Sequence, residues 1–490
     1  MADTADTADA AQTASGRRAG PGTPAEEHTG LALVGLVVCA LVASLVQTLV
    51  LPLLPEFMRS FHTSVSAVTW IFTATLLAGA VATPVLSRFG DMYGKKRMII
   101  VAMALLVAGS LVGALSGSLP VMIVGRALQG MSTALIPLAI GVIRDTFPRE
   151  RVASGIGVVS ATLGVGGGLG LLVTGIIAQN TTSYRPVFWL SVGIAAVGLV
   201  LVSTLTHDTG QRIAARPDIL GAVVMAGWLV CLLLALSEAP SWGWGSAGIA
   251  GLFAAAVVGC ALWVMIEMRT REPLVRLSLL VGPRSLWANL ASMLLGFGMY
   301  AGFALFTNLV QTPRATFGYG LSGSVLDVGL FLLPATVGMM VFGALAGRVQ
   351  KRIGAAYALA AGSVLGGLGT AWLAISSSHV YDAVGYAALL GVGFGIGYAA
   401  LGTLAVQHVP MDSSAIASGI NSLVRTAGGS VGAAITASVL ASDVIHGTSV
   451  PTLHGYVICY VILAVGSALA AAAALYSGLR YGSRAPSDKG

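Results

Sequence analysis

The sequence predicts an all-helical protein that crosses a membrane many times. Three observations lead to this fold class: 56% of the 490 residues are hydrophobic, only 9% are charged, and the apolar residues gather in long uninterrupted runs. Soluble proteins carry about 25% charged residues, so a chain of this composition belongs in a lipid bilayer. Several apolar runs exceed about 18 residues, which suits membrane-spanning helices and is too long for barrel strands of about 10 alternating residues.

Fourteen segments are long and apolar enough to span the hydrocarbon as helices. They begin near Leu31, Ala67, Met98, Leu119, Ser154, Pro186, Asp218, Ser246, Ser285, Ser324, Ala355, Tyr381, Ser414 and Thr452. Residues 1–28 repeat Thr-Ala-Asp and lack the apolar stretch of a secretory signal, so we expect a disordered cytoplasmic tail.

The distribution of positive charge predicts the topology. The net charge of +7 would suit a nucleic-acid partner, but placing the N-terminus in the cytoplasm puts all but five of the 26 Lys and Arg residues in tails and inside loops. The five exceptions are Arg59, Arg185 and Arg314 in outside loops, and Arg126 and Arg425 within helices. This asymmetry is the positive-inside rule, so we expect both termini in the cytoplasm and no nucleic-acid partner.

An internal repeat divides the chain into two halves. LSRFGDMYGKKR has a counterpart in LAGRVQKRIG, with Arg88 matching Arg348 and Gly94 matching Gly354, and ASGI occurs at both 153–156 and 417–420. We therefore expect a tail at 1–28, a six-helix half at 29–208, a linker with two extra helices at 209–283, a second six-helix half at 284–478 and a tail at 479–490.

Duplicated halves around a central path are the build of secondary transporters, with the substrate near the bilayer midplane. The alternatives from another functional class are a channel and a membrane sensor. The duplicated halves argue against a channel, and the lack of a large soluble domain argues against a sensor. The sequence contains no Walker loop, catalytic serine elbow or His-based metal spacing, and its four cysteines stand singly. We therefore expect no enzyme activity, no cofactor and no metal.

The stretch SRFGDMYGKKR, residues 87–97, resembles the loop between helices 2 and 3 of the major facilitator superfamily. Asp91, Gly94, Lys95 and Lys96 match that signature, while Ser87 and Met92 depart from it. The resemblance implies a conformational lock formed by Asp91, Gly94, Lys95, Lys96 and Arg97, which closes the inside face and must release during transport. A plain charged anchor with one compensating acid is the alternative.

Two further stretches resemble helix signatures of the same family. VMIVGRALQG at 121–130 holds Arg126 and Gln129, three residues apart and thus on one helix face. In the family such an arginine is tied to proton coupling; a structural arginine satisfied by backbone carbonyls is the alternative. GVGGGLGLLVTG at 164–175 resembles the antiporter signature of helix 5 without its proline. Glycine pairs four residues apart predict close helix packing, at Gly164 with Gly168 and at Gly428 with Gly432.

Fourteen spans with the extra pair between the halves resemble the drug:proton antiporter branch of the family. That likeness implies a multidrug efflux transporter of the cytoplasmic membrane, a small-molecule substrate, exchange for protons and function as a monomer in the lipid bilayer. One departure bears on coupling. Val46 stands in LVQT where the branch often has an acid, while Thr48 is kept. A lipid or metabolite carrier of the same fold, uncoupled or differently coupled, is therefore the second candidate.

Candidate coupling and binding residues follow from the polar side chains within the spans. Arginine does not exchange its proton, so Asp327 or Asp91 is expected to carry it, and Asp327 is the first candidate; a solvated residue at a helix start is the alternative reading. For Arg425 two roles remain equally open: binding an anionic substrate, or a structural contact with the cavity wall. The expected cavity residues offer hydrogen bonds and aromatic faces: Gln47, Thr48, Trp70, Tyr300, Asn308, Gln311, Asn421 and Arg425.

Overall fold

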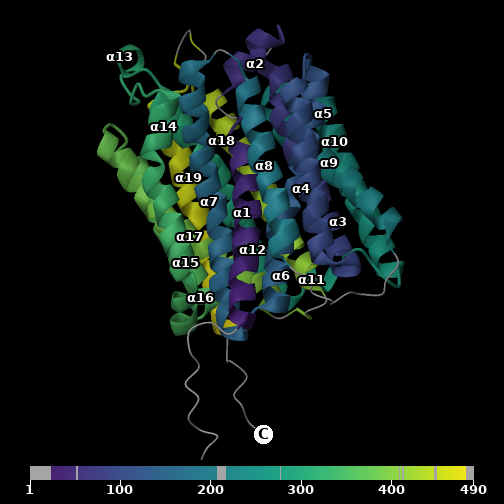
Figure 1. Ribbon diagram of the computed structural model, residues 1–490. Coiled ribbons are helices and arrows are strands. Elements are labelled where there is room, and N and C mark those ends of the chain that lie inside the picture. Colours follow the sequence, from purple (N-terminus) through teal and green to yellow (C-terminus); the bar gives the residue numbers. More distant parts are fainter. Residues whose placement is uncertain are drawn as a thin grey trace, which may run out of the picture.

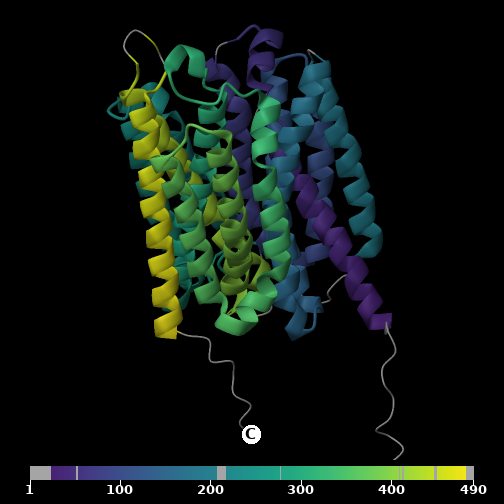
Figure 2. The same cartoon turned by 90° about the vertical axis from the view of Figure 1, so that its left-hand side faces the viewer.

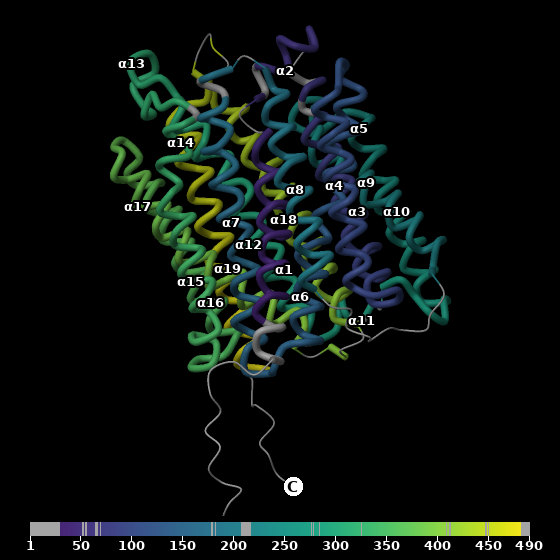
Figure 3. Tube along the Cα trace, viewed as in Figure 1, coloured from purple at the N-terminus to yellow at the C-terminus, as the bar shows by residue number. Residues whose placement is uncertain are grey.

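The computed structural model describes residues 24–481 apart from 51–52, 64, 182, 207–216, 276, 408, 411–412, 446–447 and 449 (Figures 1 and 3). Most of both predicted tails, and most of the predicted inside loop near residue 210, lie outside the described residues. The long helices run side by side along one axis of the bundle in two perpendicular views (Figures 1 and 2). The end at which α1 begins and α19 ends is called the lower end, and the opposite end the upper end.

The prediction of an all-helical polytopic fold is confirmed. Within the described ranges, 14 helical segments are long and apolar enough to cross a membrane, and each begins within five residues of its expected start. Those residues contain no β-strand, only an isolated bridge between Val444 and Pro451. Two short helices, α2 (Leu54–Ser60) and α13 (Arg314–Phe317), lie at the upper end (Figure 1).

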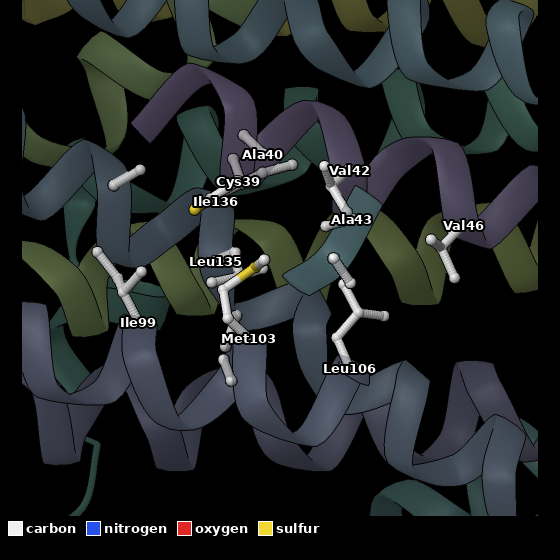
Figure 4. Close-up of a cluster of buried hydrophobic side chains, with 14 of the residues drawn as sticks. Cys39, Ala40, Val42, Ala43, Val46, Ile99, Met103, Leu106, Leu135 and Ile136 are labelled. Atoms are coloured by element: carbon white, nitrogen blue, oxygen red, sulfur yellow. The ribbon is translucent and has the colours of Figure 1, made fainter. Parts of the chain in front are cut away.

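The first half consists of six spans that share one apolar core. They are α1 (Pro24–Thr48), α3 (Val65–Tyr93), α4 (Lys95–Leu115), the continuous run α5–η2–α6 (Leu119–Gly130, Met131–Ala134 and Leu135–Thr146), α7 (Arg149–Asn180) and α8 (Arg185–Leu205). Figure 4 shows part of that core, where Cys39 and Val42 of α1 face Met103 of α4 and Leu135 of α6. These buried side chains fill the space between α1, α4 and α6.

The second half has the same number of spans and a separate core. They are α12 (Pro283–Gln311), the run α14–α15 (Val325–Phe331 and Leu333–Ile353), α16 (Ala355–Ile375), α17 (Val380–Gln407), α18 (Ser414–Ser442) and α19 (Leu453–Tyr481). Large aromatic side chains fill its centre, with Phe306 stacked on Tyr386 and Tyr386 edge-on to Tyr460.

Two extra spans, α9 (Ile219–Trp242) and α10 (Ala247–Arg269), stand at one edge of the bundle (Figure 1). α9 packs against α3 of the first half and α18 of the second. Thr73 Oγ1 lies 3.1 Å from Ser237 Oγ, and Trp244 Nε1 donates to Ser438 Oγ at 2.7 Å. The inserted pair therefore covers the line along which α3 and α18 meet. A short helix, α11 (Leu277–Val281), connects the pair to α12.

The internal repeat is visible in the backbone. Gly94 alone separates α3 from α4, with φ 109°, and Gly354 alone separates α15 from α16, with φ 88°. Because L-residues with a side chain rarely adopt such angles, both turns require glycine. The same symmetry relates the contacts between halves: Ser87 of α3 touches Gly419 of α18, while Gly347 of α15 touches Ser154 of α7.

Candidate functional site

Three charged side chains meet at the lower end, where α3 ends, α4 begins and α6 ends. Lys95 Nζ lies 3.0 Å from Asp91 Oδ1 and 2.7 Å from Asp145 Oδ2, and all three side chains are buried. Gly141 makes room for the lysine, since a Cβ there would lie 2.8 Å from Lys95 Cε. We call Asp91, Lys95 and Asp145 the lower charge cluster.

The lower charge cluster belongs to the first half but binds the second half through the first turn of α18. Asp91 accepts hydrogen bonds from the backbone N–H groups of Ala415 at 3.3 Å and Ile416 at 3.0 Å. Ser414 Oγ donates to Asp145 Oδ1 at 3.4 Å. A carboxylate at a helix N-terminus satisfies free N–H groups and complements the helix dipole. These contacts join the halves and close the bundle at this end.

The other residues of the predicted lock have different surroundings. Gly94 makes the turn that brings Lys95 back beneath Asp91, whereas Arg97 is exposed and Lys96 Nζ donates to the carbonyl of Ser203 at 2.9 Å. Sequence reasoning missed Asp145 and its neighbour Arg144, whose guanidinium donates to the carbonyl of Val409 in the second half. The sequence signal for these two residues is that they form an adjacent charged pair at the inner end of the fourth span.

Arg126 is fully buried at the centre of the first half. Its Nη1 donates to Gln129 Oε1 at 2.7 Å and to the carbonyl of Val46 at 3.4 Å, and its Nε donates to the carbonyl of Ile71 at 3.4 Å. Gln129 Nε2 in turn donates to Ser110 Oγ at 2.8 Å. No carboxylate of the described residues pairs with Arg126. Val46 thus offers only its backbone carbonyl to this charge.

The intramembrane carboxylates outside the lower charge cluster lie apart from Arg126. Asp327 forms a capping box with Ser324 at the start of α14 and accepts from both the N–H and the hydroxyl of that serine, at 2.7 and 2.8 Å. Glu238 accepts from Ser241 Oγ at 3.0 Å near the upper end of α9. Glu267 accepts from the N–H of Val275 at 3.4 Å near the lower end of α10. In the described part of the chain no three such acids, histidines or cysteines gather as a metal site.

A small cavity lies between the halves, with room for about one water molecule. Arg425 and Asn421, both expected as cavity residues, line it together with residues of α6, α7, α17 and α18: Ile136, Ile140, Ser160, Leu163, Tyr398, Gly402, Ser418 and Ser422. The other six expected residues do not line this space. Thr48 packs against the glycines of α7, and Asn308 and Gln311 are exposed near the upper end of α12.

The predicted glycine pairs lie at contacts between helices. A Cβ at Gly164 or Gly168 would overlap the side chains of Met339 or Thr336 across the halves, at 1.8 and 1.9 Å. A Cβ at Gly428 would lie 2.0 Å from the backbone oxygen of Met293, and one at Gly432 would lie 2.6 Å from that of Phe297. The first pair brings α7 against α15, and the second brings α18 against α12.

Gly428→Ala is expected to destabilise the second half by about 1–3 kcal/mol, because the added methyl group meets backbone that cannot turn aside. Gly164→Ala is expected to cost less, because the flexible thioether of Met339 can move. Gly227→Ala is the control, since nothing lies within 4 Å of a Cβ there. Thermal unfolding in detergent measures all three. Equal midpoints for Gly428→Ala and Gly227→Ala would contradict the packing argument.

Comparison with known proteins agrees with this architecture. The family model described as Major Facilitator Superfamily matches residues 36–433. The chain belongs to the major facilitator superfamily.

Related members of the superfamily include the tetracenomycin C resistance and export protein of Streptomyces glaucescens, which is 31% identical over 84% of this chain and 76% of its own length. The multidrug resistance protein Stp of Mycobacterium tuberculosis is 28% identical over 84% of this chain and 75% of its own. The multidrug transporter protein MdtP of Bacillus subtilis is 24% identical over the same shares.

Among solved structures, the human organic anion transporter MFSD10 superposes with a TM-score of 0.66. The match covers 92% of this chain and 100% of that one at 15% identity, a likeness of fold. The prediction of a major facilitator fold with two six-helix halves and two inserted helices is confirmed, and the fourteen spans and the relatives named for drug export or resistance are consistent with the predicted branch of the family.

Proposed function

We propose that this chain exports drug-like or secondary-metabolite molecules across the cytoplasmic membrane in exchange for protons. Three relatives named for antibiotic export or multidrug resistance support the substrate class. The observation that carries the proposal is the lower charge cluster, in which Asp91 pairs with Lys95 of its own half and accepts two hydrogen bonds from the start of α18 in the other half. These contacts are few and polar, so they can separate when the halves rock.

In this proposal the conformation described here is closed toward the cytoplasm. Both termini lie on that side, which agrees with the excess of Lys and Arg in the loops of the lower end. Release of Asp91 from α18 opens the lower end, admits the substrate between the halves, and is reversed after export. The chain works as a monomer, because each half supplies its own side of the path.

The coupling proton, in our proposal, binds at the lower charge cluster. Asp91 and Asp145 share one lysine at the contact between halves, so protonation of either removes charge where the conformational change occurs. Asp327, the first candidate from the sequence, is held in a capping box at the other end of the bundle and ranks behind them. A lipid or metabolite carrier with different coupling is the second candidate, favoured by the absence, among the described residues, of a carboxylate beside Arg126.

The test uses purified protein in liposomes that contain a pH-sensitive dye. A pH gradient is imposed, and tetracenomycin C, several other antibiotics and a cationic dye are added singly. Proton movement that depends on one compound is the expected result, and Asp145→Asn should abolish it while Asp327→Asn preserves it. Uptake of compounds that ignores the gradient would overturn proton antiport and favour the carrier. No uptake of any compound would overturn export itself.

A further inference from the structure

We propose that the cavity between the halves is a binding site for aromatic organic anions, in which Arg425 holds the anionic group and Tyr398 stacks against the ring. The inference rests on the proposed export function and narrows its substrate class. It predicts a preference opposite to that of a transporter for cationic dyes.

The charge of Arg425 is nearly out of water and has no anionic partner in the part of the chain that the structure describes. Its side chain is 9% exposed. Its Nη2 donates to Ser422 Oγ at 2.7 Å, and its guanidinium lies 5.1 Å from the centre of the Tyr398 ring. Among the residues that the structure describes, no carboxylate lies within 4.0 Å. A guanidinium has five N–H donors in a planar fork that matches a carboxylate, so most of its binding capacity is unused.

The remaining cavity wall is uncharged. Ser160, Ser418 and Asn421 offer neutral polar groups, and Ile136, Ile140 and Leu163 offer apolar surface. Three buried acids elsewhere in the bundle have other partners: Asp91 and Asp145 surround Lys95, and Asp382 accepts from Trp372 and Ser376. A cationic guest would meet Arg425 without a compensating acid, and charges interact strongly in a site with little water.

Arg425 and Tyr398 are held in place before any guest arrives. Gly296 allows α12 to approach α18 so closely that a Cβ would lie 2.1 Å from the carbonyl oxygen of Arg425. The Tyr398 hydroxyl donates to Met299 Sδ at 2.9 Å, on α12. The hydroxyl is thereby engaged on α12 while the ring face meets the guanidinium. A carboxylate or phenolate next to an aromatic ring fits this pair of groups.

The guest enters when the halves separate. Ile136 and Leu163 belong to the first half, and Tyr398 and Arg425 to the second, so the walls move apart when the lower charge cluster opens. In the closed conformation the walls leave room for about one water molecule. The anion is therefore bound in the open states and must leave before this closed packing forms.

The test compares two xanthene dyes of similar shape and opposite charge: fluorescein, an anion, and rhodamine 123, a cation. Fluorescence anisotropy with the purified full chain is expected to give at least about tenfold tighter binding of fluorescein, as a charge-assisted contact in a dry site implies. Arg425→Gln should lose this preference, and Arg425→Lys should keep part of it because the charge remains without the planar fork. Arg185→Gln is the control, because Arg185 is exposed and does not line the cavity. This variant should bind both dyes as the wild type does.

The wild-type comparison needs no variant, so a variant that fails to fold leaves the test intact. Equal or tighter binding of rhodamine 123 by the wild type would overturn the inference, as would undiminished fluorescein binding by folded Arg425→Gln. Vesicles separate this failure from failure of the proposed function. Export of rhodamine 123 alone would leave export standing and remove the anion site, whereas movement of neither dye nor any antibiotic would remove both.

Discussion

Asp91→Asn is expected to reduce transport by at least about tenfold while the protein is produced at normal levels. The substitution keeps the size of the side chain but removes the charge that faces Lys95 and the two backbone N–H groups of α18. The two hydrogen bonds to α18 are the part of this loss that acts between the halves, and a hydrogen bond to a charged group contributes about 1.5–3 kcal/mol. A loss of about 3 kcal/mol changes a population ratio more than 100-fold. The conformation closed at the lower end would lose most of its population. The protein could then no longer alternate between its open and closed conformations.

Drug efflux from vesicles measures this effect, with the amount of folded protein checked by gel filtration in detergent. Arg97→Gln is the matched control, because Arg97 belongs to the same loop but is exposed. It should transport nearly as well as the wild type. Full activity of Asp91→Asn would remove the lock from the mechanism and return the loop to a charged anchor.

Arg126→Ala is expected to abolish proton movement coupled to substrate. The change removes a buried charge together with its bonds to Gln129 and to the carbonyls of Val46 and Ile71. Unpaired buried acceptors cost about 1–3 kcal/mol each, so the variant should also unfold at a lower temperature. The two effects must therefore be measured separately.

Proton flux in liposomes reports coupling, and thermal unfolding reports the structural loss. Arg126→Lys keeps the charge with fewer donors and should preserve more stability than Arg126→Ala. Binding of dye at Arg425 should persist in both, since that cavity does not contain Arg126. If Arg126→Ala unfolds early yet still moves protons with substrate, the arginine is a structural tie to backbone carbonyls and coupling lies elsewhere.

The contacts of Arg126 tie α5 to the carbonyls of Val46 on α1 and Ile71 on α3, so its expected part in coupling is to position these helices rather than to carry the proton. From the pattern alone, Arg126 with Gln129 resembled a coupling pair. In the structure Arg126 is satisfied by backbone oxygens and an amide. Val46, at the position where the resemblance implied an acid, offers Arg126 only its backbone carbonyl. We therefore place proton binding in the lower charge cluster, and the Asp145→Asn measurement decides between this site and Asp327.

The sequence by itself determined the fold class, the number of spans and the repeat. Hydropathy, loop charge and matched motifs are properties of consecutive residues, and in lipid every backbone polar group must be satisfied within a helix. That constraint is why each expected span begins close to an observed one. The repeated motif places Gly94 and Gly354 at equivalent positions, and both occupy turns with positive φ.

Only the tertiary structure decided which polar groups meet. Asp145 is 50 residues from Lys95, and the start of α18 is more than 320 residues from Asp91. Arg425 of α18 lies over the ring of Tyr398, which comes from the neighbouring helix α17. Expected cavity residues such as Asn308 were chosen for polarity, but the rotation of each helix, set by packing against its neighbours, decides which side chains face the path. Contacts of this kind depend on how the helices pack in three dimensions. A local pattern of residues does not determine that packing.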